Sequence, residues 1–152
     1  MANQKKNIFV KVIACVLVMV LIAPVGVNAA VPETAMPMAS DYLMSYTAYI
    51  CAVGGGDLEI WFRVTGTGTQ EYLGVLSILL YESTDNANWY WVETFLDTEY
   101  DTMLGTNAWY HMNHVDYQGV AGRYYKAYVQ IWGGPAEGGE TRYIWTDVEQ
   151  AT

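Results

Sequence analysis

GRYYKAYVQIW, residues 122–132, alternates between two sets of side chains. Successive side chains of a β-strand point to opposite faces, so residues two apart share a face. One set is apolar and is expected to face a core: Tyr125, Ala127, Val129 and Ile131. The other set carries three aromatic residues that are expected to face outward: Tyr124, Tyr128 and Trp132. The segment therefore predicts a half-buried β-strand at residues 123–132.

Strand and turn signals recur along the rest of the chain. Residues 58–65, LEIWFRVT, alternate cleanly, and GGGD before them is typical of a tight turn. Residues 74–82 are almost wholly apolar, which predicts a central strand covered on both faces. Seven strands are predicted, at residues 42–52, 58–65, 74–82, 89–95, 109–117, 123–132 and 141–148. This pattern predicts an all-β fold, a seven-stranded antiparallel β-sandwich of the immunoglobulin or fibronectin-III type, with a closed barrel as the alternative.

One local motif favours the sandwich. Residues 122–127, GRYYKA, resemble the tyrosine corner of immunoglobulin-like domains, in which a Tyr hydroxyl bonds to backbone upstream. Tyr125 is the better candidate for that role because it shares the inward face with Ala127.

A wider resemblance rests on four segments: SDYLMSYTAYI (40–50), FRVTGTG (62–68), LGVLSILLYESTDN (73–86) and YQGVAGRYYKA (117–127). Together they resemble a family of small secreted proteins of Gram-positive anaerobic bacteria, known only as a domain of unknown function. The resemblance covers nearly all of the chain after the N-terminal segment. It implies a secreted β domain, and it implies no catalytic residue and no ligand.

The N-terminal segment has the layout of a secretory signal peptide. Three lysines precede an apolar run at residues 12–22, and small residues follow a Pro-Gly break. We predict a signal peptide at 1–29, a flexible leader at 30–40 and a β domain at 41–149, in a secreted protein that is extracellular or associated with the cell envelope. An uncleaved anchor is disfavoured, because a bilayer span needs roughly 20 apolar residues. Lipidation of Cys15 is disfavoured, because the apolar run continues beyond it.

The mature chain would be strongly acidic. Three of the seven basic residues lie in the signal peptide and all sixteen acidic residues lie after it, which leaves a net charge of −12. Such a surface repels nucleic-acid phosphates and anionic lipid, so no nucleic-acid partner and no stable membrane insertion are expected. It favours solubility and cationic partners.

Cys51 would be the single cysteine of the mature chain, so no internal disulfide can form. Its place in an alternating apolar run predicts a buried thiol, with an exposed, dimerising thiol as the alternative.

Metal ligands are present in two patterns, and neither is specific. His111, His114 and Asp116 form HxxHxD, but on a strand His111 points away from the other two. Asp97, Glu99 and Asp101 are the calcium candidate, and Asp85, Asn86 and Asn88 are a less specific one. No cofactor is predicted.

The sequence also gives no reason to expect an enzyme. No pair of carboxylates is marked out among sixteen acidic residues, and a Gly-x-Ser-x-Gly elbow is absent.

Aromatic residues provide the strongest indication of function. The chain has six Trp and thirteen Tyr, and exposed flat rings are platforms for sugar rings or for protein partners. We predict ligand-binding residues on the outward faces: Tyr124, Tyr128, Trp132 and Trp61. Tyr143 and Trp145 would widen this platform if they share the same face. The predicted function is a secreted, acidic, non-catalytic protein that binds carbohydrate or protein. The alternative is a structural or envelope-associated protein whose rings only stabilise its sheets.

Overall fold

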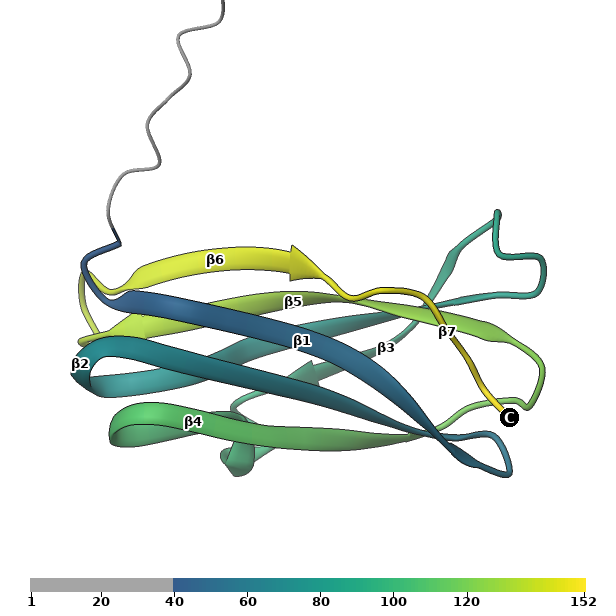
Figure 1. The fold of residues 1–152 in the computed structure, drawn as a ribbon, viewed down its shortest axis with the longest axis horizontal. Coiled ribbons are helices and arrows are strands. Elements are labelled where there is room, and N and C mark those ends of the chain that lie inside the picture. The colour runs from purple at the N-terminus through teal and green to yellow at the C-terminus, as the bar shows by residue number, and fades with distance from the viewer. Residues whose placement is uncertain (1–39) are drawn as a thin grey trace, which may run out of the picture. The chain divides into compact units, whose positions relative to one another are not determined.

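The computed structural model describes residues 40–152, so the expected signal peptide and nearly all of the expected leader lie outside the described residues. The elements of the described part are β1 Leu43–Gly54, β2 Asp57–Ser83, β3 Tyr90–Leu96, the 3₁₀ helix η1 Asp101–Met103, β4 Leu104–Gln118, β5 Tyr124–Gly134, β6 Glu140–Trp145 and β7 Glu149–Gln150 (Figure 1). None of these described elements is a helix long and apolar enough to cross a membrane.

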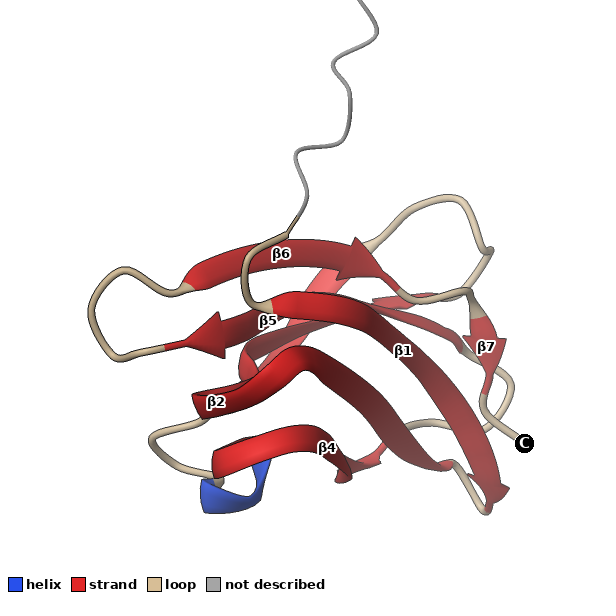
Figure 2. Cartoon of the chain, turned by 60° about the vertical axis from the view of Figure 1, so that its left-hand side comes forward, coloured by secondary structure: helices blue, strands red, loops and turns tan. Residues whose placement is uncertain are grey.

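All seven strands belong to one antiparallel sheet. β2 is its centre: it pairs with β1, β3, β4 and β5, and β5 pairs in turn with β6 and β7. The sheet curls into a half-barrel with two layers, one of β1, β4 and the first half of β2, the other of β3, β5, β6 and the second half of β2. In Figure 2 β6 runs along the upper edge of the half-barrel and β4 along its lower edge. The prediction of an all-β antiparallel fold with seven strands is confirmed, but the strands form one continuous sheet where two separate sheets were expected.

A bend in β2 makes the sheet continuous. The register with β4 changes from Thr65 opposite Tyr110 to Gln70 opposite Ala108, so four residues of β2 face a single residue of β4. Before the bend β2 pairs with β1 and β4, and after it β2 pairs with β4 as far as Gly74 and with β5 and β3. Bends of this kind let one strand pass from one layer to the other. Figure 1 shows β2 and β4 bending back at the same end. Residues 66–73, which separate two of the predicted strands, therefore belong to β2, and the strands predicted at 58–65 and 74–82 are one.

The core lies between the two layers of the curled sheet. β2 contributes alternate residues from its first half and, with a register irregularity between Val75 and Ser77, from its second half. β5 contributes every second residue, as its sequence predicts. The largest fully buried side chains are Tyr125, Phe62, Leu58, Ile60, Leu73, Ile78, Leu80, Met103, Ile131, Val64, Val75 and Val129. Burial of apolar area is the main term that stabilises such a fold.

Tyr125 joins the core to the backbone at one end of the molecule. Its side chain is 0% exposed, its hydroxyl accepts a hydrogen bond from the Val120 N–H at 2.9 Å, and it donates to Oε2 of Glu82 at 2.5 Å. Burial, followed by the hydrogen bond to the Glu82 carboxylate, raises the pKa of Tyr125 to about 12. This is the geometry of a tyrosine corner, with the hydroxyl bonded to backbone five residues upstream.

Cys51 is half-buried, where a buried thiol was expected. The preceding residue, Ile50, is buried. Because side chains alternate along a strand, Cys51 points to the outer face of β1, opposite Glu59 of β2.

Candidate functional site

The outer face of β5 continues across β6 as a group of aromatic rings. Tyr128 pairs in register with Trp145, and their ring centroids are 4.8 Å apart. The ring of Tyr143 lies nearly parallel to that of Tyr128, with centroids 5.5 Å apart and an interplanar angle of 10°. Tyr143 and Trp145 are 54% and 51% exposed. We call Tyr128, Tyr143 and Trp145 the aromatic face.

Contacts from neighbouring elements hold Trp145 in place. The ammonium group of Lys126 lies 4.3 Å from the ring centroid of Trp89 and 4.9 Å from that of Trp145. A cation over a ring face is attracted by the quadrupole of the ring. Tyr81 of β2 also packs against Trp145, with centroids 5.4 Å apart. One side of the indole is thus fixed by the protein, while half of its surface stays open to solvent.

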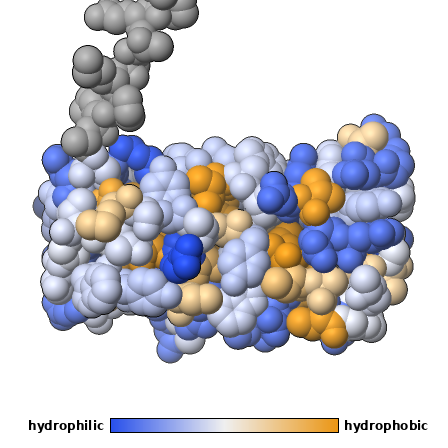
Figure 3. Space-filling model, viewed as in Figure 1, coloured by the Kyte–Doolittle hydropathy of each residue, from blue (hydrophilic) through white to orange (hydrophobic). Residues whose placement is uncertain are grey.

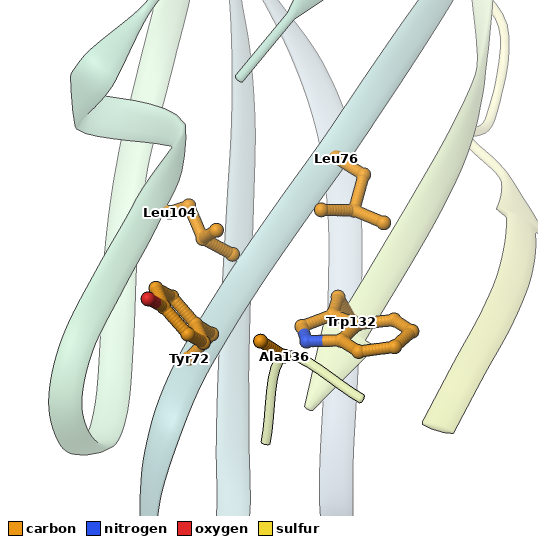
Figure 4. A pocket seen from close by; sticks show the side chains of 5 residues that line it. All are labelled: Tyr72, Leu76, Leu104, Trp132 and Ala136. Carbon is orange, nitrogen blue, oxygen red and sulfur yellow. The ribbon is translucent and has the colours of Figure 1, made fainter. Parts of the chain in front are cut away.

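A groove lies further along the same face of β5. Trp132, four residues after Tyr128, lines it together with Tyr72, Leu76, Leu104 and Ala136, and its volume is about 260 Å³. Figure 4 shows the rings of Tyr72 and Trp132 on opposite sides of Ala136, with the indole nitrogen of Trp132 on the side toward Ala136. We call this feature the apolar groove.

Gly139 keeps the wall of the apolar groove in position. A Cβ atom at Gly139 would lie 2.3 Å from a ring carbon of Trp132 and 2.9 Å from the carbonyl oxygen of Pro135. The indole edge therefore rests directly on the backbone of the β5–β6 turn. Any side chain at this position would force the indole to move.

The four predicted ligand-binding residues are divided between two layers. Tyr128 belongs to the aromatic face and Trp132 to the apolar groove. Tyr124 is half-buried at the start of β5, opposite Gln150 of β7. Trp61 lies in the other layer, on β2 between Tyr49 of β1 and His114 of β4. The structure thus brings Tyr128 and Trp132 onto one face and separates Trp61 from them.

Several residues that contribute to the aromatic face and the apolar groove were not predicted from the sequence as ligand-binding residues. Residues 74–82 were expected to be covered on both faces, but Leu76, Leu79 and Tyr81 are only half-buried. Trp89 precedes β3, so strand alternation could not have assigned it to a face. The mixed composition of residues 141–145 left the direction of Tyr143 and Trp145 open, and pairing with β5 decides it.

The predicted calcium ligands do not form a cluster. Asp97 is half-buried and Glu99 is exposed in the segment after β3, and Asp101 is exposed at the start of η1. Among the described residues, these three carboxylates do not bring one oxygen each to within 4.8 Å of the other two.

The second acidic turn has a structural role. The carboxylate of Asp85 accepts hydrogen bonds from the backbone N–H groups of Asn88 and Ala87 and from the side chains of Asn88 and Ser83. These bonds, led by that from the Asn88 backbone, hold the pKa of Asp85 well below its usual range. The carboxylate stabilises the β2–β3 turn, in which Asn86 has a positive φ of 56°.

The two histidines lie on opposite faces of β4, as the spacing of HxxHxD predicts. His111 is hydrogen-bonded through Nε2 to the carbonyl oxygen of Thr102 at 2.9 Å, and its ring packs beside Phe62. His114 and Asp116 share the outer face, with Nε2 and Oδ1 3.5 Å apart.

Comparison with known proteins gives no match to a family model, to a curated protein or to a solved structure. The resemblance to secreted proteins of Gram-positive anaerobes therefore stays a prediction.

Proposed function

We propose that this protein is a secreted, non-catalytic binding protein that holds an extended, uncharged polysaccharide across the aromatic face and the apolar groove. The observation that carries the proposal is the pair of half-exposed rings, Tyr143 and Trp145, set beside Tyr128 on one sheet surface. Flat rings held in this way present large apolar area at little cost in conformational entropy.

The spacing along β5 suits a long ligand. Tyr128 and Trp132 are four residues apart on one strand, which corresponds to roughly 13 Å. A chain of several sugar rings would reach from the aromatic face to the apolar groove. Between these two positions lies Gln130, whose Oε1 accepts a hydrogen bond from the buried Ser77 hydroxyl at 2.9 Å and whose amide NH₂ can donate to sugar hydroxyl groups.

Charge favours an uncharged ligand over an anionic one. The chain carries sixteen acidic and seven basic residues. The ammonium group of Lys126, close to the aromatic face, is engaged with two indole rings. A polyanion would meet net repulsion from the acidic surface, whereas a neutral glycan would not.

The proposal includes the location and ancestry of the domain. Residues 1–29 are a signal peptide that is removed, so that the mature protein starts near Ala30 and acts outside the cell. The half-barrel is related to immunoglobulin-like domains, and the hydrogen bond from Val120 to Tyr125 supports that relationship. Intact-mass analysis of protein from culture medium tests the cleavage. Recovery of the chain with Met1 retained, in membranes only, would contradict it.

Retention on insoluble uncharged glycans tests the binding. The Trp145→Ala and Trp132→Ala variants are expected to lose roughly tenfold or more in affinity, as for a hot-spot ring, with melting temperatures close to that of the parent. Gly139→Ala, which displaces the Trp132 indole without removing it, should weaken binding to an intermediate degree.

Trp61→Ala is the matched control, because Trp61 is an indole of the other layer. Its affinity for the glycan should equal that of the parent. Loss of retention in Trp61→Ala but not in Trp145→Ala would contradict the proposal, because the glycan would then bind over β1, β2 and β4 and not over β5 and β6. Equal loss of melting temperature and retention in Trp145→Ala would favour the alternative, a protein whose rings only stabilise its sheet.

A further inference from the structure

A second group of functional side chains lies on the outer face of the other layer, over β1, β2 and β4. Glu59 of β2 is directly opposite Asp116 of β4, and Trp61 is directly opposite His114. All four side chains point away from the core, because their neighbours Leu58, Ile60 and Val115 are buried. Figure 3, viewed from this side, shows a largely hydrophilic surface with scattered apolar patches.

We propose that Glu59, His114 and Asp116 form a binding site for a zinc ion that joins β2 to β4. One ligand atom from each of the three residues lies within 4.8 Å of the other two. The Nε2 atom of His114 and the Oδ1 atom of Asp116 are 3.5 Å apart. Bonds of about 2.0–2.1 Å in a tetrahedral zinc site place neighbouring ligand atoms about 3.3 Å apart. The histidine and Asp116 already have that spacing, and Glu59 needs only a small side-chain movement.

The ligand set suits zinc in particular. One imidazole and two carboxylates are among the ligand combinations that zinc accepts, and three protein ligands leave a fourth position for water. Magnesium and calcium prefer sites made of oxygen ligands alone. A divalent cation would also relieve the repulsion between two carboxylates that lie opposite each other on neighbouring strands.

Trp61 supports two of the three ligands. Its indole N–H donates a hydrogen bond to Oε2 of Glu59 at 2.8 Å, which leaves Oε1 for the metal. Its ring centroid lies 4.3 Å from that of His114, and on the other side its ring stacks with that of Tyr49 at 6.5 Å. Hydrogen bonds and packing of this kind orient metal ligands and strengthen binding. Trp61, predicted as a sugar-binding residue, is thereby assigned a positioning role at this site.

Other charged side chains nearby allow a competing explanation, in which the acidic surface attracts cations without a defined site. Asp57 occupies the outward position before Glu59, and Arg63 occupies the one after Trp61. Asp116 can also attract a protonated His114 with no metal present. The test must therefore separate a defined zinc site from general attraction of cations to an acidic surface.

The chain has two histidines, which makes imidazole NMR a direct test. Zinc added to the EDTA-treated protein should shift the ring signals of His114 saturably, with a stoichiometry of one, and leave those of His111 in place. An absence of any His114 shift at millimolar zinc, or an equal shift of both histidines, would overturn the proposal.

Variants define the site. His114→Ala should abolish saturable binding measured by calorimetry, and Glu59→Gln and Asp116→Asn should each weaken it roughly tenfold or more. Trp61→Phe, which keeps a ring and removes the N–H donor, should cost roughly tenfold. Asp57→Asn is the matched control and should leave the affinity unchanged. If Asp57→Asn weakens zinc binding as much as Glu59→Gln, the ion is attracted by net charge and the site is refuted. Circular dichroism without zinc checks that each variant is folded.

Discussion

The two faces of β5 carry aromatic residues in opposite environments. On the inner face Tyr125 is 0% exposed and uses its hydroxyl in two hydrogen bonds. On the outer face Tyr128 is half-buried against β6, where Tyr143 and Trp145 are about half exposed. The same type of ring therefore contributes to stability on one face and offers surface on the other. Substitutions on the inner face should change the free energy of unfolding, and those on the outer face should change binding.

The largest effect is expected for Tyr125→Ala. Removal of a fully buried ring leaves a cavity and costs about 3–5 kcal/mol of unfolding free energy. Urea denaturation followed by tryptophan fluorescence measures the loss. A midpoint within error of the parent would show that the ring is not part of the core.

High pH should reveal the same contact as a loss of stability. The pKa of Tyr125 is raised to about 12 in the folded state, above its ordinary value of 10.0. Between these values the unfolded chain releases the proton that the folded chain retains, so the contribution of Tyr125 to stability is complete below pH 10 and falls as the pH rises toward 12.

Tyr117 shifts the pH dependence in the same direction. Its ring packs edge-on against Tyr125, with centroids 5.9 Å apart, and burial, followed by the charge of Glu82, raises its pKa. Denaturation midpoints measured from pH 8 to pH 12 should therefore fall less steeply in Tyr125→Phe than in the parent, without becoming flat. Identical slopes in the two proteins would contradict the assignment.

Tyr125→Phe at neutral pH should cost less than the alanine variant, about 1 kcal/mol. The ring still fills the core, but the Val120 N–H loses its acceptor and Glu82 loses a donor. Arg123 still contacts the Glu82 carboxylate, which limits the loss. A cost as large as that of Tyr125→Ala would mean that the hydroxyl, and not the buried ring, dominates at this position.

Sequence reasoning succeeded where a local pattern determines the structure. The alternation of residues 123–132 and of residues 58–65 assigns inward and outward residues correctly, because a strand has a period of two wherever it lies in the sheet. It failed at the bend of β2, where GTGTQ at 66–70 has the composition of a loop but stays in the sheet. Gly66 pairs with Leu43 of β1, Thr67 donates a backbone hydrogen bond to Tyr42, and pairing with β4 resumes at Gln70. These long-range contacts are not encoded locally.

The two candidate sites were predictable to different degrees for the same reason. Tyr128 and Trp132 lie on one strand, so their common face follows from their spacing. Glu59 and His114 are distant in the chain and meet only through the register of β2 against β4. A shift of one residue in that register would turn one side chain to the other face, so no local pattern could have joined them.

The smallest effect on stability is expected for Tyr143→Ala, and it tests the comparison most directly. Tyr143 lies on β6 and is 54% exposed, so its removal deletes a cross-strand ring contact with Tyr128 but leaves the core intact. Contacts of this kind contribute about 0.2–1 kcal/mol, so the urea midpoint should barely move. Retention on the bound glycan should nevertheless fall clearly, because the ring forms part of the proposed platform. A loss of stability comparable to that of Tyr125→Ala would remove the distinction between the two faces of β5. Unchanged stability with unchanged retention would leave Tyr143 outside the binding surface and confine the ligand to Trp145 and the apolar groove.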